Sequence, residues 1–135
     1  MKKDIPENLV VDISIAVVLE FETPETKSWA VYLINQKNVF IETVLITSKG
    51  YGLKDGESVK TSILRHHIKK VEANSFAKIE LIQEEVFGLN NEYWVSYYIN
   101  GEIFDKKFVF LPESILDTNF IKVPLVNKPG VVIGN

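Results

Sequence analysis

YWVSYYINGEIFDKKFVF, residues 93–110, is the stretch that decides the fold. Asn100 and Gly101 stand at its centre, and this pair favours a type I′ turn because both central positions of that turn need positive φ. The flanking residues, 93–99 and 102–111, are rich in aromatic and β-branched side chains, which fit a pleated surface. The sequence therefore predicts an antiparallel hairpin with a two-residue loop.

The length of this loop also fixes the register of the hairpin. Counting outward from the loop, Trp94 faces Lys107. One face is then apolar and is expected in the core, with Tyr93, Val95, Tyr97, Ile99, Phe104 and Phe108. The other face contains Ser96 and Asp105 together with four residues that we expect to form an interface with a partner: Trp94, Tyr98, Ile103 and Lys107. On this face the Lys107 ammonium is expected to lie over the Trp94 ring.

The first half of the chain contains three more apolar runs. Residues 9–21, LVVDISIAVVLEF, alternate with a period of two, which predicts a strand with one face in the core and the other in water. Residues 29–34 and 39–47 are expected to pair as a hairpin around the polar residues 35–38, NQKN. Because apolar side chains occupy both parities of this hairpin, it is either covered on both sides or part of a partner interface.

The rest of the chain has weaker signals. Residues 50–56, GYGLKDG, are predicted as a loop; residues 59–71 are interpreted as a strand in preference to a helix, and residues 75–88 fit either. A helical turn is expected at 114–116, and closing strands at 120–126 and 131–133. We therefore expect one all-β domain over residues 1–135, a mostly antiparallel two-sheet sandwich or partly open barrel with at most one short helix.

Composition limits the class of protein. The 135 residues are 46% hydrophobic and 24% charged, as in ordinary globular domains. A net charge of −3 argues against general nucleic-acid binding, which depends on neutralising phosphates. The absence of cysteine excludes disulfides and thiolate chemistry and fits a reducing compartment. We expect a cytoplasmic protein with no signal peptide and no membrane contact.

One cluster of charges suggests a ligand site. Arg65, His66 and His67 are the only arginine and histidines, and the run 59–71 adds Lys60, Lys69 and Lys70 without any acid. Arg65 and one histidine are candidates to bind an anion, together with the loop residues Gly50, Tyr51 and Gly52. Adjacent side chains on a strand point to opposite faces, so the two histidines are not expected to share a metal. The alternative interpretation is a solvated basic strand that discourages association between sheets.

Familiar catalytic motifs are absent. The sequence has no GxSxG, HExxH, kinase or Walker pattern, so an enzyme would depend on residues outside these motifs. We expect no metal and no cofactor.

Three stretches carry a resemblance to a known family: WAVYLIN (29–35), VLITSKGYG (44–52) and RHHIKKVEANSFAKIELIQEEVFGLNNEYWVSYYING (65–101). Through them, most of the chain from residue 29 to residue 127 resembles a family of short, uncharacterised bacterial proteins. Some members are labelled phenylalanyl-tRNA synthetase alpha subunit. The shared stretches are patterns of strands and turns, so no synthetase residue can be assigned to a position in this sequence.

Three functions are compatible with these observations. The first is a non-catalytic binding or protein-interaction module that works as a homodimer. The second is an anion-binding domain or modest enzyme that uses Arg65 and a neighbouring histidine. The third is single-stranded nucleic-acid binding through the aromatic residues of the 93–110 hairpin, as on base-stacking platforms.

Overall fold

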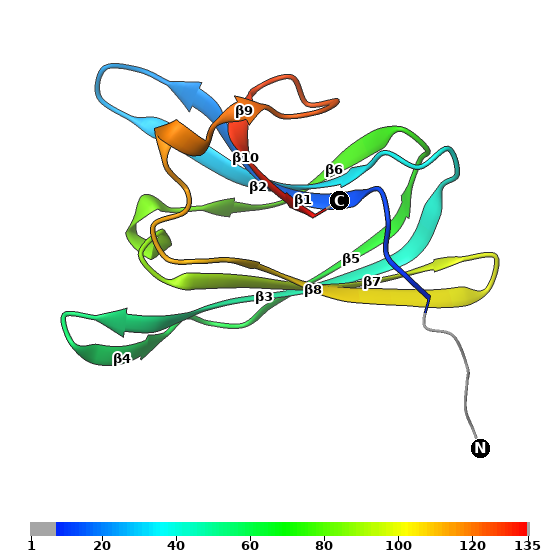
Figure 1. The fold of residues 1–135 in the computed structure, drawn as a ribbon, viewed down its shortest axis with the longest axis horizontal. Coiled ribbons are helices and arrows are strands. Elements are labelled where there is room, and N and C mark those ends of the chain that lie inside the picture. Colours follow the sequence, from blue (N-terminus) through cyan, green and yellow to red (C-terminus); the bar gives the residue numbers. More distant parts are fainter. Residues whose placement is uncertain (1–7, 135) are drawn as a thin grey trace.

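The computed structural model describes residues 8–134, which form two antiparallel sheets packed face to face (Figure 1). Sheet 1 contains, in spatial order, β6 (Ser75–Ile82), β2 (Lys27–Asn35), β1 (Ile13–Glu22), β10 (Pro129–Gly134) and β9 (Ile121–Lys122). In sheet 2, β3 (Ile41–Lys54) pairs on one side with β4 (Glu57–Lys60) and β5 (Leu64–Val71), and on the other with β7 (Asn90–Ile99), which pairs with β8 (Glu102–Phe110). The sheets do not close into a barrel, so the predicted sandwich is confirmed.

Helical structure in the described residues is limited to two short 3₁₀ turns. They are η1 (Glu84–Val86) and η2 (Asp117–Asn119). The helical turn expected at 114–116 therefore lies three residues further along the chain. Residues 75–82 form a strand rather than a helix, and only η1 keeps a helical form in the 75–88 segment.

The β7–β8 hairpin has the register that its Asn-Gly turn predicts. Ile99 pairs with Glu102 and Trp94 with Lys107, and Asn100 and Gly101 have φ of 50° and 78°. The face expected in the core is directed between the sheets: Tyr93, Val95, Tyr97 and Phe108 are buried, while Ile99 and Phe104 pack against them at the margin. The opposing surface of the core comes from sheet 1, mainly from β1 and β2, with Ile79 and Ile82 of β6 and Val131 of β10.

The prediction that residues 29–34 and 39–47 pair as a hairpin is wrong. β2 pairs with β1 and β6 in sheet 1, whereas β3 lies in sheet 2. The buried Asn35 explains the difference: its Nδ2 donates to the carbonyls of Val39 and Glu72 at 3.0 Å each, and its Oδ1 accepts from the Lys37 N–H at 3.0 Å. These bonds hold a connection that crosses from one sheet to the other, so the polar residues 35–38 do not make a hairpin turn.

The outer face of sheet 1 corrects a second expectation. On β1 the face predicted to meet water is buried at Ser14, Ala16 and Val18. A small second core forms there because the segment 123–126, which follows β9, lies over the sheet (Figure 1). It contains Ala16, Val18, Ala30, Tyr32, Ile34 and Val123, with Leu125, Val126 and Val132 packed against them. The closing strand expected at 120–126 is thus mostly a covering segment.

Both ends of the first predicted strand also differ. Leu9 and Val11 are exposed and precede β1, which begins at Ile13. Phe21 is exposed as well, because the pairing with β2 shifts by one residue between Leu19 and Phe21. Such a shift reverses the faces to which later side chains point.

The predicted loop at 50–56 is largely strand. β3 continues to Lys54, and only Asp55 and Gly56 form the turn, with φ of 53° and 81°. The expected strand at 59–71 is confirmed but interrupted, since β4 ends at Lys60 and β5 begins at Leu64. At the interruption Thr61 approaches Gly50 so closely that a Cβ on Gly50 would lie 2.9 Å from the Thr61 methyl group.

Candidate functional site

The outer face of sheet 2 is open, whereas the outer face of sheet 1 is covered by the segment 123–126. No described segment lies outside sheet 2 (Figure 1). Three large apolar side chains on this face are about half exposed: Leu45 (48%), Trp94 (46%) and Ile103 (50%). Isolated exposed apolar residues are normal, but several on one sheet face mark a candidate interaction surface.

Cross-strand pairing places these residues on one surface. Trp94 pairs with Thr47 of β3 and with Lys107 of β8, so the three side chains form a row across three strands. In the next row Leu45 pairs with Ser96, and beyond it Tyr98 pairs with Ile103. The four residues predicted as an interface are therefore neighbours, and Leu45 joins them. We call this set the interface patch: Leu45, Trp94, Tyr98, Ile103 and Lys107.

Trp94 is held by a cation–π contact. The Lys107 Nζ lies 6.0 Å from the centre of the Trp94 ring, as the hairpin register predicts. Contacts of this kind at exposed sites are worth about 0.5 to 1 kcal/mol. The contact favours one orientation of the indole, while almost half of the Trp94 surface remains open to a partner.

Charges around the interface patch are of both signs. Lys107 and Arg65 are cations of the Trp94 row, and Asp105 lies in the next row opposite Ser96. On the opposite side of the Trp94 row, Lys49 pairs with Glu92, with 3.8 Å between Nζ and Oε2. A surface with alternating signs is suited to a second surface of the same kind, whereas a nucleic-acid site needs a predominance of cations.

The two histidines of β5 face opposite sides of sheet 2, as expected for adjacent strand residues. His66 pairs with Ile46, whose side chain is in the core, while His67 pairs with the exposed Leu45. Arg65 pairs with Thr47 and is exposed beside His67. Arg65 and His67 thus border the interface patch, and His66 belongs to a different environment.

His66 contacts Glu80 of sheet 1. The His66 Nε2 lies 2.6 Å from Glu80 Oε1, and the same carboxylate accepts hydrogen bonds from the hydroxyls of Ser48 (2.9 Å) and Tyr93 (3.2 Å). Burial and the Glu80 carboxylate raise the pKa of Tyr93. Because the Ser48 hydroxyl donates to Glu80 and not to His66, the cluster does not have the Ser–His–acid arrangement of a catalytic triad. It connects β6 of sheet 1 with three strands of sheet 2.

Gly50, Tyr51 and Gly52 line a hollow of about 600 Å³ where β4 and the end of β3 extend beyond the sandwich (Figure 1). Lys49 and Lys60 also line it, but Arg65 and the histidines do not. The Tyr51 hydroxyl donates to Glu92 at 3.4 Å, and partial burial together with this carboxylate raises the pKa of Tyr51. The structure therefore does not bring Arg65 and the glycines of this stretch into a single site.

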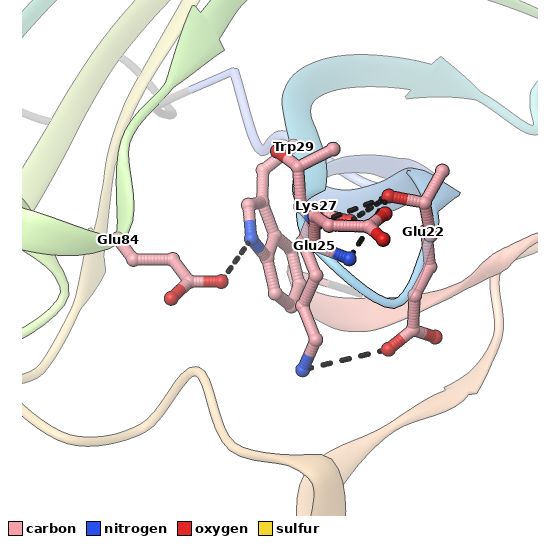
Figure 2. A network of polar contacts seen from close by, with 7 residues as sticks. Glu22, Glu25, Lys27, Trp29 and Glu84 are labelled. Carbon is pink, nitrogen blue, oxygen red and sulfur yellow. Dashed lines mark hydrogen bonds and ion pairs between the residues drawn. The ribbon is translucent and has the colours of Figure 1, made fainter.

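A second polar network closes one end of the sandwich near the β1–β2 turn (Figure 2). The indole N–H of Trp29 donates to Glu84 Oε2 at 2.7 Å, and the Trp29 ring packs edge-on against Phe87. Lys27 and Glu22 form an exposed pair 3.7 Å apart. Because Glu84 accepts a hydrogen bond from the buried Trp29, this network anchors the turn η1 to β2.

Sequence reasoning did not identify Leu45 or Glu80 as members of a site. Leu45 lies in an apolar run, and a bulge at Thr43, which has φ of 49°, sets which of its neighbours face outward. Glu80 stands in a charged segment, and its burial depends on strand pairing between distant segments. No local feature of the sequence marks Glu80, because its partners Ser48, His66 and Tyr93 lie 13 to 32 residues away along the chain.

Comparisons with protein-family models, with curated proteins and with solved structures found no significant match. None of the helical segments among residues 8–134 has the length and apolar character needed to cross a bilayer. In the same part of the chain, no three His, Asp or Glu side chains lie close enough together to hold a metal ion.

Proposed function

We propose that the protein is a small cytoplasmic interaction module without catalysis of its own, and that it acts as a homodimer joined through the interface patch. The observation that carries this proposal is the exposed Trp94, held by Lys107 on a sheet face that no described segment covers. Tryptophan, tyrosine and arginine are the residues that most often dominate binding energy at protein interfaces.

The mixed charges favour a second copy as the partner. In a two-fold dimer the same patch is used by both subunits, so a cation on one copy must find an acid on the other. The face offers both, with Arg65 and Lys107 as cations and Asp105 as an acid. Leu45, Trp94 and Ile103 would then be removed from water together.

The two other functions have less support. An anion site that combines Arg65 with the glycines at 50–52 requires residues that lie apart in the structure. Single-stranded nucleic-acid binding would use Trp94 and Tyr98 as stacking surfaces, but Asp105 and Glu92 lie on the same face and would repel phosphates.

Fluorescence quenching by acrylamide tests the proposed dimer in the unmodified protein. Trp29 is only 6% exposed, so quenching reports mainly on Trp94. We expect quenching to fall as the protein concentration rises from micromolar to millimolar, because the dimer buries Trp94. The variant Ile103→Asp should lose this dependence, and Phe21→Ala, which alters an exposed aromatic residue of β1, should keep it. Quenching that is independent of concentration in the unmodified protein would overturn the proposal.

A further inference from the structure

β5 is an edge strand with an unusual charge. It pairs with β3 on one side and with no strand on the other within the described residues. The run 59–71 contains four cations and two histidines without an acid, although the whole chain has a net charge of −3. An edge of this length, eight residues, presents unpaired backbone groups to any extended segment of suitable charge.

The register shows which backbone groups are unpaired. The Gly50 carbonyl accepts from the Thr61 N–H at 2.9 Å, so the backbone groups of Gly50 point toward the side of β4 and β5. Backbone groups along a strand alternate between its two neighbours, so those of Ser48 and Ile46 point the same way and pair with Leu64 and His66. The N–H and C=O groups of Arg65 and His67 therefore point away from β3, toward the open edge.

The edge also has a place for an apolar side chain. A hollow of about 280 Å³ lies between the start of β5 and the end of β6, and Leu64, Leu81, Ile82 and Val86 are among its lining residues. Leu64 and Leu81 are 46% and 60% exposed. The acid in this hollow, Glu80, is bonded to Ser48, His66 and Tyr93, so its carboxylate is directed between the sheets and not toward the open edge of β5.

We propose that β5 binds an extended acidic segment of another protein as an additional strand of sheet 2. Its backbone would pair with Arg65 and His67, and its acidic side chains would lie beside theirs on the outer face. An apolar side chain of opposite parity would enter the hollow beside Leu64 and Leu81. In this mode of recognition the main chain supplies affinity and the alternating side chains supply specificity. The site adjoins the interface patch at Arg65 and His67 but uses the unpaired backbone edge of β5, so it extends the proposed function without depending on the dimer.

Hydrogen exchange of the unmodified protein tests the proposal. The probe is a capped peptide of alternating glutamate and valine with the length of β5, and a lysine–valine peptide of equal length is its control. We expect the glutamate–valine peptide to slow amide exchange at Arg65 and His67, with no change at Trp94. The lysine–valine peptide should leave all three amides unchanged. Equal protection by both peptides, or no protection by either at millimolar concentration, would overturn the proposal.

Variants separate an added strand from charge attraction alone. The variant His67→Pro removes an N–H that points toward the open edge while keeping the bonds between β5 and β3. We expect it to weaken peptide binding about tenfold or more. The matched control is Asp105→Pro, which removes the corresponding outward N–H of edge strand β8 and should leave binding unchanged. Arg65→Glu should also weaken binding. If Trp94→Ala abolishes peptide binding and His67→Pro does not, the peptide uses the interface patch, and the strand proposal fails while the interaction module stands.

Discussion

The outer faces of the two sheets differ in what covers them. On sheet 1, the segment 123–126 buries Ala16, Val18 and Ala30 completely. On sheet 2, the corresponding face leaves Leu45 and Trp94 about half exposed. Both faces contain apolar side chains, so apolar character alone does not determine burial. A face is buried when another segment of the chain reaches it, and an apolar face that no segment reaches is available to a partner.

The residue sizes and charges explain which face the chain covers. Ala16 and Ala30 on sheet 1 are small, which lets the segment after β9 approach the sheet closely. The outer face of sheet 2 carries Lys49, Lys107 and Asp105, whose charges would lose hydration under a covering segment. The outer face of sheet 2 can thus be covered only by a surface that supplies opposite charges.

The largest expected effect comes from placing a carboxylate on each face. Val123→Asp buries a charge with no partner in the small core, and we expect the free energy of unfolding to fall by about 4 kcal/mol or more. Leu45→Asp puts the same group on the bare face and should change it by about 0.5 kcal/mol at most. Urea denaturation of the two variants measures both values. Similar losses in the two variants would show that the faces do not differ in burial.

Gly130 tests how closely β10 approaches β1 beneath the covered face. A Cβ at Gly130 would lie 2.4 Å from the Val17 carbonyl oxygen and 2.9 Å from a Val123 methyl group. We expect Gly130→Ala to destabilise the protein by about 2 to 3 kcal/mol, since backbone cannot move aside. Gly88→Ala is the control, because its Cβ would meet only the Glu113 carboxylate at 3.4 Å. Thermal unfolding of both variants gives the comparison, and a stable Gly130→Ala would contradict the packing described for sheet 1.

Tyr97 and Tyr93 test the inner side of sheet 2, beneath the bare face. The Tyr97 hydroxyl is buried without a hydrogen-bond partner among the described residues, whereas the Tyr93 hydroxyl donates to Glu80. We expect Tyr97→Phe to stabilise the protein by about 1 kcal/mol and Tyr93→Phe to destabilise it by about the same amount. Denaturant melts provide the measurement. Destabilisation by Tyr97→Phe would mean that its hydroxyl has a partner.

Alkaline pH should weaken both sheets through buried tyrosines. Burial raises the pKa of Tyr97 to about 12, and burial with a hydrogen bond to Glu20 raises the pKa of Tyr32 to about 12, from an ordinary value of 10.0. The folded state favours the neutral phenols, so their contribution is complete below pH 10 and is lost as the pH rises from about 10 to 12. Ultraviolet titration of the folded protein should show late ionisation of Tyr32 and Tyr97, and also of Tyr93, whose pKa is raised by burial and by the Glu80 carboxylate. Tyr32→Phe should remove one of them and reduce the loss of stability.

The part of the fold that could be predicted from sequence is the part determined by local geometry. The Asn100-Gly101 turn fixed the register of β7 and β8, and the contact of Lys107 with Trp94 followed from it. The residues around Asn35 have the same polar composition as a turn, yet they connect two sheets, because the Asn35 side chain bonds to residues 39 and 72. Bonds to a segment so distant in sequence leave no local pattern.

Some features of the candidate site could also be predicted from the sequence, and others could not. The opposite orientation of His66 and His67 follows from the period of a strand, and the structure agrees. The separation of Arg65 from the hollow at Gly50 depends on the interruption at 61–63 and on the extension of β3 to Lys54. Neither the interruption nor the extension could be predicted from the glycine-rich residues 50–56, because such a stretch is also typical of a loop.

Sedimentation velocity over a range of concentrations tests the central claim, that the interface patch joins two copies of the chain. For the unmodified protein we expect a reversible shift from monomer to dimer as concentration rises. Trp94→Ala should remain a monomer while losing only about 1 kcal/mol of stability, since Trp94 is about half exposed in the single chain and mainly loses its contact with Lys107. An unmodified protein that stays monomeric throughout, or a Trp94→Ala variant that dimerises as well as the unmodified protein, would contradict the account.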